Sequence, residues 1–229
     1  MKKLKGLSGS QLKLIALGSM TCDHVGALLV ESTPLRIIGR LSFPIFACMI
    51  AEGCAHTHSR GRYLRNMAAL ALVCQLVCLV VGGSLTQCVP VTFCLSIGLI
   101  YLLDWARARQ SAGGWLAVLG ALCGVFFLCE VLPELLKETD FRVEYGFCGV
   151  MLPVLCYIGR DRREKLALFT LGTAALRLDS VALQWFGMGA VVLMAFYNGQ
   201  RGKRPMKRLF YIYYPAHLAL IWLIRLFFM

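Results

Sequence analysis

Long apolar segments separated by short polar gaps dominate this sequence and restrict what the chain can fold into. Hydrophobic residues make up 59% of the 229 residues and charged residues only 16%, against about 45–50% and about 25% in soluble domains. The core of a water-soluble domain of this size has no room for so much apolar surface, so the composition predicts a polytopic membrane protein. It excludes a disordered chain, a DNA-binding domain and a secreted disulfide scaffold.

The apolar segments predict nine spanning helices within one domain of residues 1–229. They cover roughly 11–30, 40–55, 64–82, 90–104, 115–133, 145–159, 165–178, 179–197 and 208–228. A spanning helix needs about 20 residues, so nine of them leave only short loops. Because each segment must satisfy its own backbone hydrogen bonds in lipid, we expect an all-α transmembrane bundle rather than a barrel. The sixth and seventh segments are short and broken by Gly and Pro, so eight or ten spans are the alternatives.

The basic residues predict the orientation of these spans. Of the 24 Lys and Arg, 18 lie in the N-terminal segment and in every second gap after it, and six lie on the other side. Positive residues accumulate at the cytoplasmic ends of membrane helices. The pattern therefore predicts the N-terminus inside and the C-terminus outside. It also explains the net charge of +12 by membrane orientation, and no nucleic-acid partner is expected.

Neither the cysteines nor the histidine pairs predict a metal site. The 11 cysteines are an odd number and lie mostly inside apolar segments, where Cys packs as a small apolar residue. His56 and His58 have no third ligand at a fixed spacing, which makes a weak metal motif. We therefore expect no metal cofactor.

Some ionisable residues lie inside the predicted spans, where an unpaired charge costs several kcal/mol. Asp23 and His24 lie in the outer half of the first span, Arg40 begins the second at a similar depth, and His217 lies near the middle of the last. One interpretation is structural, with Asp23 paired to Arg40 and His24 bonded to a backbone carbonyl. The other places His24 in a cavity, which His217 also lines unless a Tyr hydroxyl holds it.

A second polar cluster follows the second span at its cytoplasmic end. Glu52 lies twelve residues after Arg40, about 18 Å along a helix, and His56, Arg60 and Arg62 follow it, with Tyr63 next in the sequence. This cluster is either an anchor that obeys the positive-inside rule, with a buried acid paired to it, or a receptor for an anionic cytoplasmic ligand that carries phosphates.

A base near the outer side and cations near the inner side favour chemistry across the bilayer. A histidine is the usual proton acceptor near neutral pH, and Arg and Lys bind the phosphates of a donor. Acyl transfer from a thioester fits this arrangement. A proton-coupled transporter of a small solute would use much the same residues, and a non-catalytic assembly factor is a third interpretation.

Ordered blocks of sequence between residues 14 and 218 resemble the TraX family. They comprise Asp23-His24-Val25-Gly26, Gly39-Arg40-Leu41-Ser42-Phe43-Pro44, Ala51-Glu52-Gly53, Glu144-Tyr145-Gly146, Tyr197-Asn198-Gly199 and Tyr214-Pro215-x-His217. TraX proteins are named for the enzyme that N-acetylates F-pilin. The family is similar to a wider superfamily of transmembrane acyltransferases, which includes heparan-α-glucosaminide N-acetyltransferase and in which a membrane histidine is implicated in moving acetyl from cytoplasmic acetyl-CoA across the membrane.

The resemblance implies a transmembrane acyltransferase-like domain in the bacterial cytoplasmic (inner) membrane, with acetyl-CoA as the acyl donor. His24 is then the catalytic candidate, as general base or as transient acetyl carrier, and Asp23 orients or charge-balances the site. The acceptor stays open between a protein such as a pilin, a glycan and a lipid. The residues expected to bind the donor or to line its site are Arg40, Glu52, Arg60, Arg62, Tyr63, Asn198, Lys207, Arg208, Tyr214 and His217.

Overall fold

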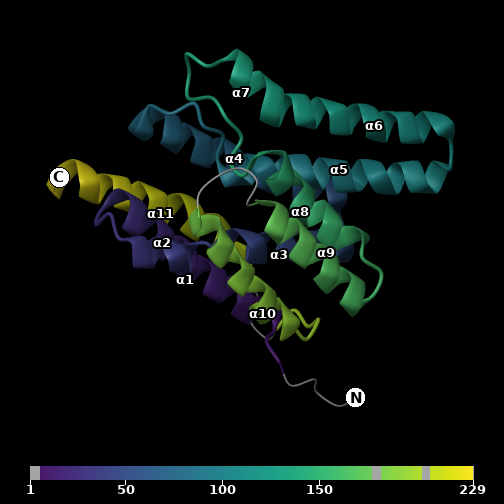
Figure 1. The fold of residues 1–229 in the computed structure, drawn as a ribbon, viewed down its shortest axis with the longest axis horizontal. Coiled ribbons are helices and arrows are strands. Elements are labelled where there is room, and N and C mark those ends of the chain that lie inside the picture. The colour runs from purple at the N-terminus through teal and green to yellow at the C-terminus, as the bar shows by residue number, and fades with distance from the viewer. Residues whose placement is uncertain (1–5, 177–181, 203–206, 229) are drawn as a thin grey trace. The chain divides into compact units, whose positions relative to one another are not determined.

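The structure, a computed structural model, describes residues 6–176, 182–202 and 207–228, and the regular elements in these ranges are helices (Figure 1). The chain forms two compact units. Unit 1 combines residues 1–49 with residues 160–229, and unit 2 consists of residues 50–159. The boundary falls inside α3 (Ser42–His56). The expectation of an all-α protein is confirmed over the described residues, whereas the assignment of one domain stays a prediction.

Unit 1 joins the two ends of the sequence. It contains the first part of α3 together with α1 (Gly9–Leu28), α2 (Thr33–Gly39), α9 (Arg162–Ala175), the 3₁₀ helix η3 (Ala182–Met188), α10 (Gly189–Ala195) and α11 (Lys207–Phe228). Helix α1 packs against both α2 and α11, and η3 packs against α2, α9 and α10. The first and last described helices are therefore direct neighbours.

The start of α1 is held both by its own cap and by a distant segment. Ser8 and Gln11 form a capping box, in which each side chain accepts a hydrogen bond from the other residue's backbone N–H. Just before the cap, Leu7 forms a parallel bridge with Tyr197. The N–H of Gly9 also donates to the carbonyl of Gln200 at 2.8 Å. The segment that follows α10 thus fixes where α1 begins.

Two glycines allow α1 and α2 to approach closely. A Cβ added to Gly26 would lie 2.7 Å from Cβ of Leu35, and one added to Gly39 would lie 2.3 Å from Cβ of Asp23. Distances this short cannot be relieved by rotating a side chain. Gly26 on α1 and Gly39 on α2 are therefore positions where these two helices approach closely.

We expect Gly39→Ala to destabilise unit 1 by about 1–3 kcal/mol, the usual range for an overpacked interior position. The added methyl group meets the Cα and Cβ of Asp23, so the two helices must separate. Gly18→Ala is the matched control, because Gly18 is exposed on α1 and has nothing within 4 Å of an added Cβ. Thermal unfolding in detergent should show a lower Tm for Gly39→Ala only. Equal Tm values for the two variants would contradict the close approach.

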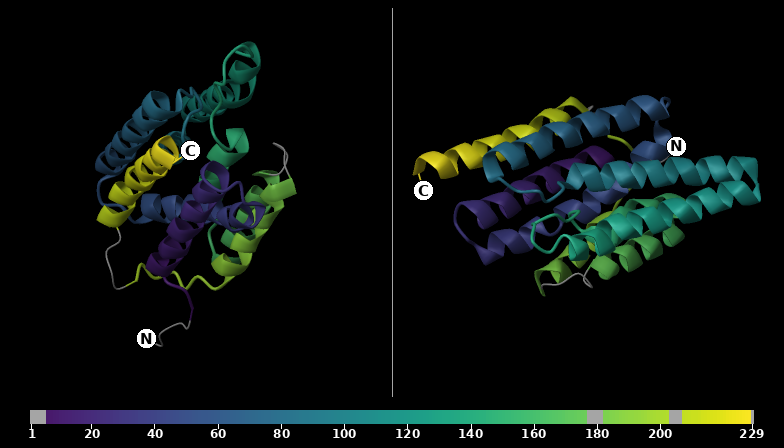
Figure 2. Two further views of the ribbon diagram at one scale, coloured as in Figure 1. Left: turned by 90° about the vertical axis from the view of Figure 1, so that its left-hand side faces the viewer. Right: turned by 90° about the horizontal axis from the view of Figure 1, so that it is seen from above.

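Unit 2 is organised around α5. It contains the rest of α3 with α4 (Arg60–Gly82), α5 (Val89–Arg109), α6 (Ala112–Phe126), the π-helix η1 (Phe127–Val131), α7 (Leu132–Leu135) and α8 (Gly146–Ile158). Helix α5 packs against α4, α6 and α8, and it runs antiparallel to α6 (Figure 1 and the right-hand view of Figure 2). Ser96 on α5 donates to the carbonyl of Val150 on α8 at 2.8 Å, the kind of interhelical hydrogen bond that joins membrane helices.

The π-helix η1 positions an acid at the start of another helix. Oε1 of Glu130 accepts a hydrogen bond of 2.7 Å from the backbone N–H of Phe147, in the first turn of α8. The first N–H groups of a helix have no partner within that helix, so Glu130 acts as a cap supplied from a distance. Glu130 falls near the end of the predicted segment 115–133, and the structure places it in this helical segment.

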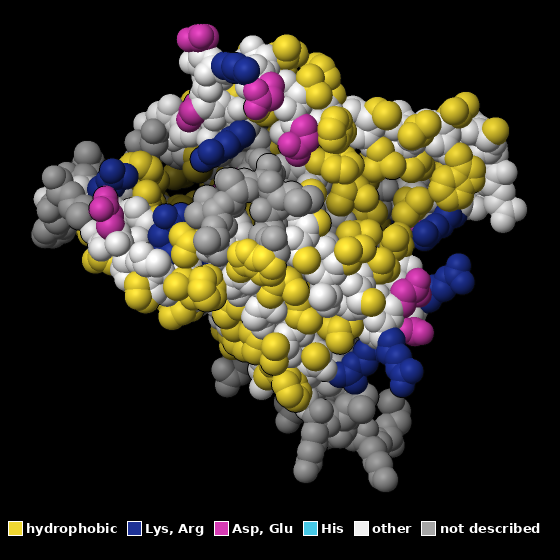
Figure 3. Space-filling model, in the orientation of Figure 1, with side chains coloured by type: hydrophobic (Ala, Val, Ile, Leu, Met, Phe, Trp, Pro, Cys, Tyr) yellow, Lys and Arg dark blue, Asp and Glu magenta, His cyan; other side chains and the backbone are white. Residues whose placement is uncertain are grey.

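The helices agree with the predicted apolar segments, but not all of them are long enough to be spans by themselves. Among the described residues, four helical stretches are long and apolar enough to cross a membrane, namely Thr33–His56, Arg60–Val80, Val89–Arg109 and Ala112–Leu135. Only 6% of the apolar window in the fourth is buried within the protein, and its apolar side chains cover the upper right of Figure 3. Such exposure is expected of a lipid-facing helix. The chain is a membrane protein, while the count of nine spans and the orientation stay predictions.

Candidate functional site

The ion pair expected between Asp23 and Arg40 is present in unit 1. The guanidinium of Arg40, which directly follows α2, donates to Oδ1 of Asp23 on α1. The two side chains are only 11% and 17% exposed, respectively. Nε of Arg40 also donates to the carbonyl of Arg36 at 3.3 Å. Two opposite charges thus neutralise each other in a largely desolvated place between α1 and α2.

A histidine pair joins α1 to α11 beside this ion pair. Nδ1 of His24 lies 2.8 Å from Nε2 of His217, across 193 residues of sequence. His217 is 6% exposed, whereas His24 is half-buried. Nδ1 of His217 lies 2.9 Å from the carbonyl oxygen of Tyr213. The structural interpretation of the sequence assigned a backbone carbonyl to His24, but the structure gives His24 the ring of His217 and gives the carbonyl to His217.

Two tyrosines of α11 hold the ring of His217. The Tyr213 ring stacks on it with centroids 5.3 Å apart and an interplanar angle of 11°. The Tyr214 ring meets it edge-on at 5.6 Å and 88°. The expectation that a Tyr hydroxyl holds His217 is not met, because the hydroxyl of Tyr213 instead lies 2.6 Å from Oγ1 of Thr21 on α1. His217 is thus oriented by ring contacts and by a carbonyl.

Arg60, expected to bind phosphates, is paired in unit 2. Its guanidinium donates to Oδ2 of Asp104 at 2.5 Å and lies over the ring of Tyr101. The hydroxyl of Tyr157 donates to the same carboxylate oxygen at 2.7 Å. Sequence reasoning missed Asp104, because the acid lies at the far end of another apolar segment and only the packing of α4 on α5 reveals the pair.

The other expected residues of unit 2 lie at the junction of α3 and α4. Oε2 of Glu52 is 3.6 Å from Nδ1 of His56, one helical turn away. The hydroxyl of Tyr63 occupies the space beside Gly53, where an added Cβ would lie 2.3 Å from it. Arg62 is exposed on α4. These residues are local to unit 2, and the histidine pair belongs to unit 1.

Asn198 has a structural role in the loop after α10. Its side-chain amide donates to the carbonyl of Gly6 at 3.3 Å, and its Oδ1 accepts from the backbone N–H of Gln200 at 2.9 Å. The first contact holds the N-terminal segment against this loop, and the second is local to the loop. Lys207 and Arg208 begin α11, and their side chains lie outside the described residues.

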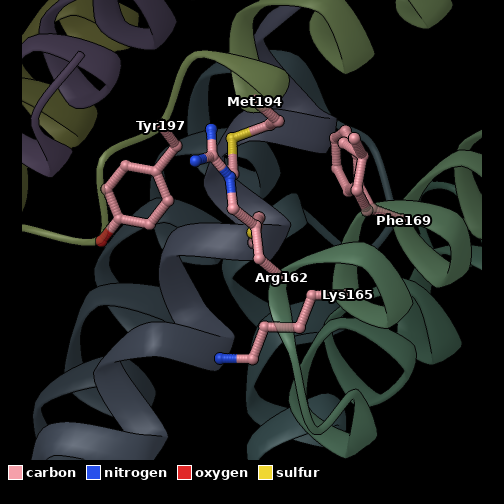
Figure 4. Close-up of a pocket in the computed structure, with 7 residues that line it drawn as sticks. Arg162, Lys165, Phe169, Met194 and Tyr197 are labelled. Atoms are coloured by element: carbon pink, nitrogen blue, oxygen red, sulfur yellow. The ribbon is translucent and has the colours of Figure 1, made fainter. Parts of the chain in front are cut away.

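A small cavity of about 50 Å³ in unit 1 contains basic residues that sequence reasoning used only for orientation. Arg162 and Lys165 come from the first turn of α9, and Figure 4 shows Arg162 beside Met194 and Tyr197. Nη2 of Arg162 donates to the carbonyl of Ala195 at the end of α10 at 2.6 Å. The remaining lining residues are Cys48, Leu166 and Phe169. The cavity thus combines apolar walls with two cationic side chains.

The cavity and the histidine pair lie toward opposite ends of α1. Tyr197, which lines the cavity, is bridged to Leu7 just before α1, and His24 comes fifteen residues after Gly9, where α1 begins. At about 1.5 Å per residue this separation is about 22 Å along the helix axis. Within the described ranges, no group of three His, Cys, Asp or Glu is placed to hold a metal ion. The unit therefore presents a basic recess at one end and an imidazole pair toward the other.

Comparisons with known proteins give two matches. Residues 8–225 match the family model described as "TraX protein". The chain is also 24% identical over 244 residues to a protein of Dichelobacter nodosus named "Probable fimbrial assembly protein FimC, serogroup H1", and the alignment covers 93% of this chain and 94% of that protein. No solved structure matches the chain significantly.

Proposed function

Because this chain belongs to the TraX family, we propose that it is an integral membrane acetyltransferase of the bacterial inner membrane. It moves an acetyl group from cytoplasmic acetyl-CoA to an amine or hydroxyl at or beyond the outer face. The acceptor is a protein such as a pilin, a glycan or a lipid. The observation that carries the proposal is the imidazole of His24, held at 2.8 Å by His217 within a membrane protein.

The transfer needs one base, and His24 is the residue suited to that role. The acceptor's nitrogen or oxygen attacks the thioester carbonyl while His24 takes its proton, and the C–S bond breaks. The released CoA thiolate then receives the proton from the imidazolium of His24. A positioned histidine typically contributes about 10²–10⁴-fold to such a step. In the alternative, the imidazole itself carries the acetyl group before the acceptor attacks.

The Asp23–Arg40 pair adds no net charge beside the proposed base, because its two charges are opposite. The carboxylate already accepts from the guanidinium, so Asp23 balances Arg40 and is not itself the base. A second base would compete with His24 for the acceptor's proton. We therefore assign proton transfer to His24, and to Asp23 and Arg40 the fixing of α1 against the end of α2.

The basic cavity of unit 1 is the best-supported place for the phosphates of the donor. In the predicted orientation the start of α1 and the segment 159–165 face the cytoplasm, where acetyl-CoA is found. The separation of about 22 Å along α1 suits a donor whose long flexible arm lies between its phosphates and its thioester. A compact donor such as acetyl phosphate could not reach both places. Arg60 fits this role less well, since Asp104 already pairs with it.

Replacing Arg162 and Lys165 together with Gln is expected to raise KM for acetyl-CoA at least tenfold with little change in kcat. Each charge-assisted hydrogen bond to a phosphate is worth about 1.5–3 kcal/mol, and the chemistry lies at the other end of α1. The control is Arg163→Gln, because Arg163 is an exposed neighbour on the same turn that does not line the cavity. An unchanged KM in the double variant would remove this cavity from donor binding.

The decisive experiment uses the full chain in sealed lipid vesicles. Acetyl-CoA labelled in its acetyl group is added on the side of the basic segments, and glucosamine or a short peptide with a free N-terminus is enclosed on the other side. An acetyltransferase attaches the label covalently to the enclosed amine and releases CoA. A proton-coupled transporter accumulates a solute without forming that bond, and an assembly factor does neither. Either of the last two outcomes overturns the proposal.

A further inference from the structure

We infer that His217 is a positioning residue that fixes the tautomer of His24, so that Nε2 of His24 is the reacting nitrogen. This inference rests on the proposed acetyl transfer for its chemistry. The assignment of hydrogen to particular ring nitrogens does not depend on acetyl transfer. A chain of hydrogen bonds runs from the Tyr213 carbonyl through His217 to Nδ1 of His24.

This chain of hydrogen bonds begins at a carbonyl group, which can only accept a hydrogen bond. The carbonyl oxygen of Tyr213 lies 2.9 Å from Nδ1 of His217, so that nitrogen must be the donor. A neutral imidazole carries a single N–H, and its other nitrogen is then an acceptor. Nε2 of His217 is therefore the acceptor in the 2.8 Å contact with His24. Nδ1 of His24 must donate in that contact, which leaves the lone pair of His24 on Nε2.

The direction of this chain depends on a neutral His217, and its surroundings favour that form. The ring is 6% exposed and is enclosed by Tyr213, Tyr214 and His24. In the part of the chain that the structure describes, no carboxylate forms an ion pair with His24 or His217. The carboxylate of Asp23 is already paired with Arg40. A buried imidazolium without a counter-charge is expensive, so His217 stays neutral.

A second contact between α1 and α11 helps to hold His24 and His217 next to each other. Thr21 and His24 lie three residues apart on α1, and Tyr213 and His217 lie four apart on α11, so each pair shares a helix face. The Tyr213 hydroxyl is 2.6 Å from Oγ1 of Thr21, which itself donates to the carbonyl of Leu17. The Tyr213 hydroxyl is thus the donor to Thr21. Two hydrogen bonds one turn apart therefore fix the ring of His24 relative to α11.

This arrangement assigns separate tasks to the two nitrogens of His24. Among the described residues, Nε2 of His24 makes no hydrogen bond and is available to substrate. When it takes the acceptor's proton, the Nδ1–H of His24 keeps its bond to His217. That bond becomes charge-assisted and stronger as the imidazolium forms. His217 thus orients the base and stabilises its protonated form without touching the substrate, the role that a third group has in catalytic triads.

Two substitutions separate the acceptor role of His217 from its bulk. In His217→Gln the side-chain oxygen can replace Nε2 as an acceptor, whereas His217→Met fills similar space without a strong acceptor. In the vesicle assay we expect His217→Gln to keep kcat within about tenfold of wild type and His217→Met to lose about 100-fold, a typical contribution of a well-placed base. KM for acetyl-CoA should stay unchanged in both. Equal kcat values for the two variants would overturn the positioning role.

The tautomer is also measured without any reaction, by nitrogen-15 NMR of protein labelled at histidine. The chain holds four histidines, so removing His56 and His58 leaves two sets of ring signals. We expect both His24 and His217 to carry hydrogen on Nδ1, and we expect His24 to lose this preference in His217→Met. Tyr213→Phe is the control, because it keeps the carbonyl that bonds His217 and removes only the hydroxyl.

The two readouts distinguish failure of the inference from failure of the proposed function. If wild-type protein transfers no acetyl group yet shows hydrogen on Nδ1 of both rings, the function fails and the assignment of nitrogens holds. If His24 carries its hydrogen on Nε2 in active wild-type protein, the inference is overturned and acetyl transfer stands. Retention of hydrogen on Nδ1 of His24 in folded His217→Met protein overturns the inference as well.

Discussion

His24→Ala is expected to lower acetyl transfer by about 10²–10⁴-fold, the contribution of a positioned general base. The loss should appear in kcat. The basic cavity lies near the start of α1, and His24 lies about 22 Å further along that helix. The helices should remain folded, since the ring is only half-buried and its removal leaves no charge unpaired. Initial rates in vesicles, normalised to the amount of folded protein, measure the effect.

The control for this variant is His56→Ala. The His56 side chain is 73% exposed, and its Nδ1 lies 2.9 Å from the carbonyl of Glu52 one turn earlier. It can be removed without disturbing α1 or α11. Transfer at the wild-type rate by His24→Ala, in a preparation where His56→Ala is also active, would remove His24 from the mechanism.

Asp23→Ala is expected to destabilise the protein by about 3 kcal/mol, because it removes the carboxylate that balances the largely desolvated guanidinium of Arg40. Only 11% of that side chain is exposed. The double variant Asp23→Ala with Arg40→Met should recover part of the loss, since no charge then remains at the site. Unfolding of the detergent-solubilised protein gives the free energies for this double-mutant cycle.

Glu134→Ala provides the comparison for the ion pair. Glu134 pairs with Lys137 at 3.2 Å, but these side chains are 74% and 72% exposed. Exposed pairs contribute only about 0–1 kcal/mol, so little change is expected. A loss in Asp23→Ala no larger than that in Glu134→Ala would show that the Asp23–Arg40 pair does not stabilise unit 1.

The helices could be predicted from sequence because apolar runs and their polar ends are local features. The predicted segment 64–82 corresponds to α4 (Arg60–Gly82), and 90–104 to α5 (Val89–Arg109). The predicted second span, 40–55, begins at the break between α2 and α3, but the short helix α2 (Thr33–Gly39) in the gap before it was not predicted. The seventh segment becomes a helix of 14 residues, α9, which is shorter than the roughly 20 residues a span needs. Its role in the bilayer therefore depends on its packing.

The site could be predicted only in part. The depth of a residue along a helix follows from the local sequence, whereas the direction in which its side chain faces depends on how the helix packs. Similar depth was enough to pair Asp23 with Arg40. The contact between His24 and His217 depends on how α1 turns toward α11, so the sequence indicated at most a shared cavity. Arg162 was missed for another reason. A basic residue in the gap between two apolar segments gives the same sequence pattern whether it only orients the membrane helices or also lines a cavity.

The two histidines of the pair are 193 residues apart in the sequence, so they are synthesised at different times. Helix α1 leaves the ribosome before α11, the last described helix. His24 is therefore synthesised before the ring that it contacts, and so is Thr21, whose partner Tyr213 is 192 residues away. The contact between His24 and His217 therefore forms only after α11 has been synthesised.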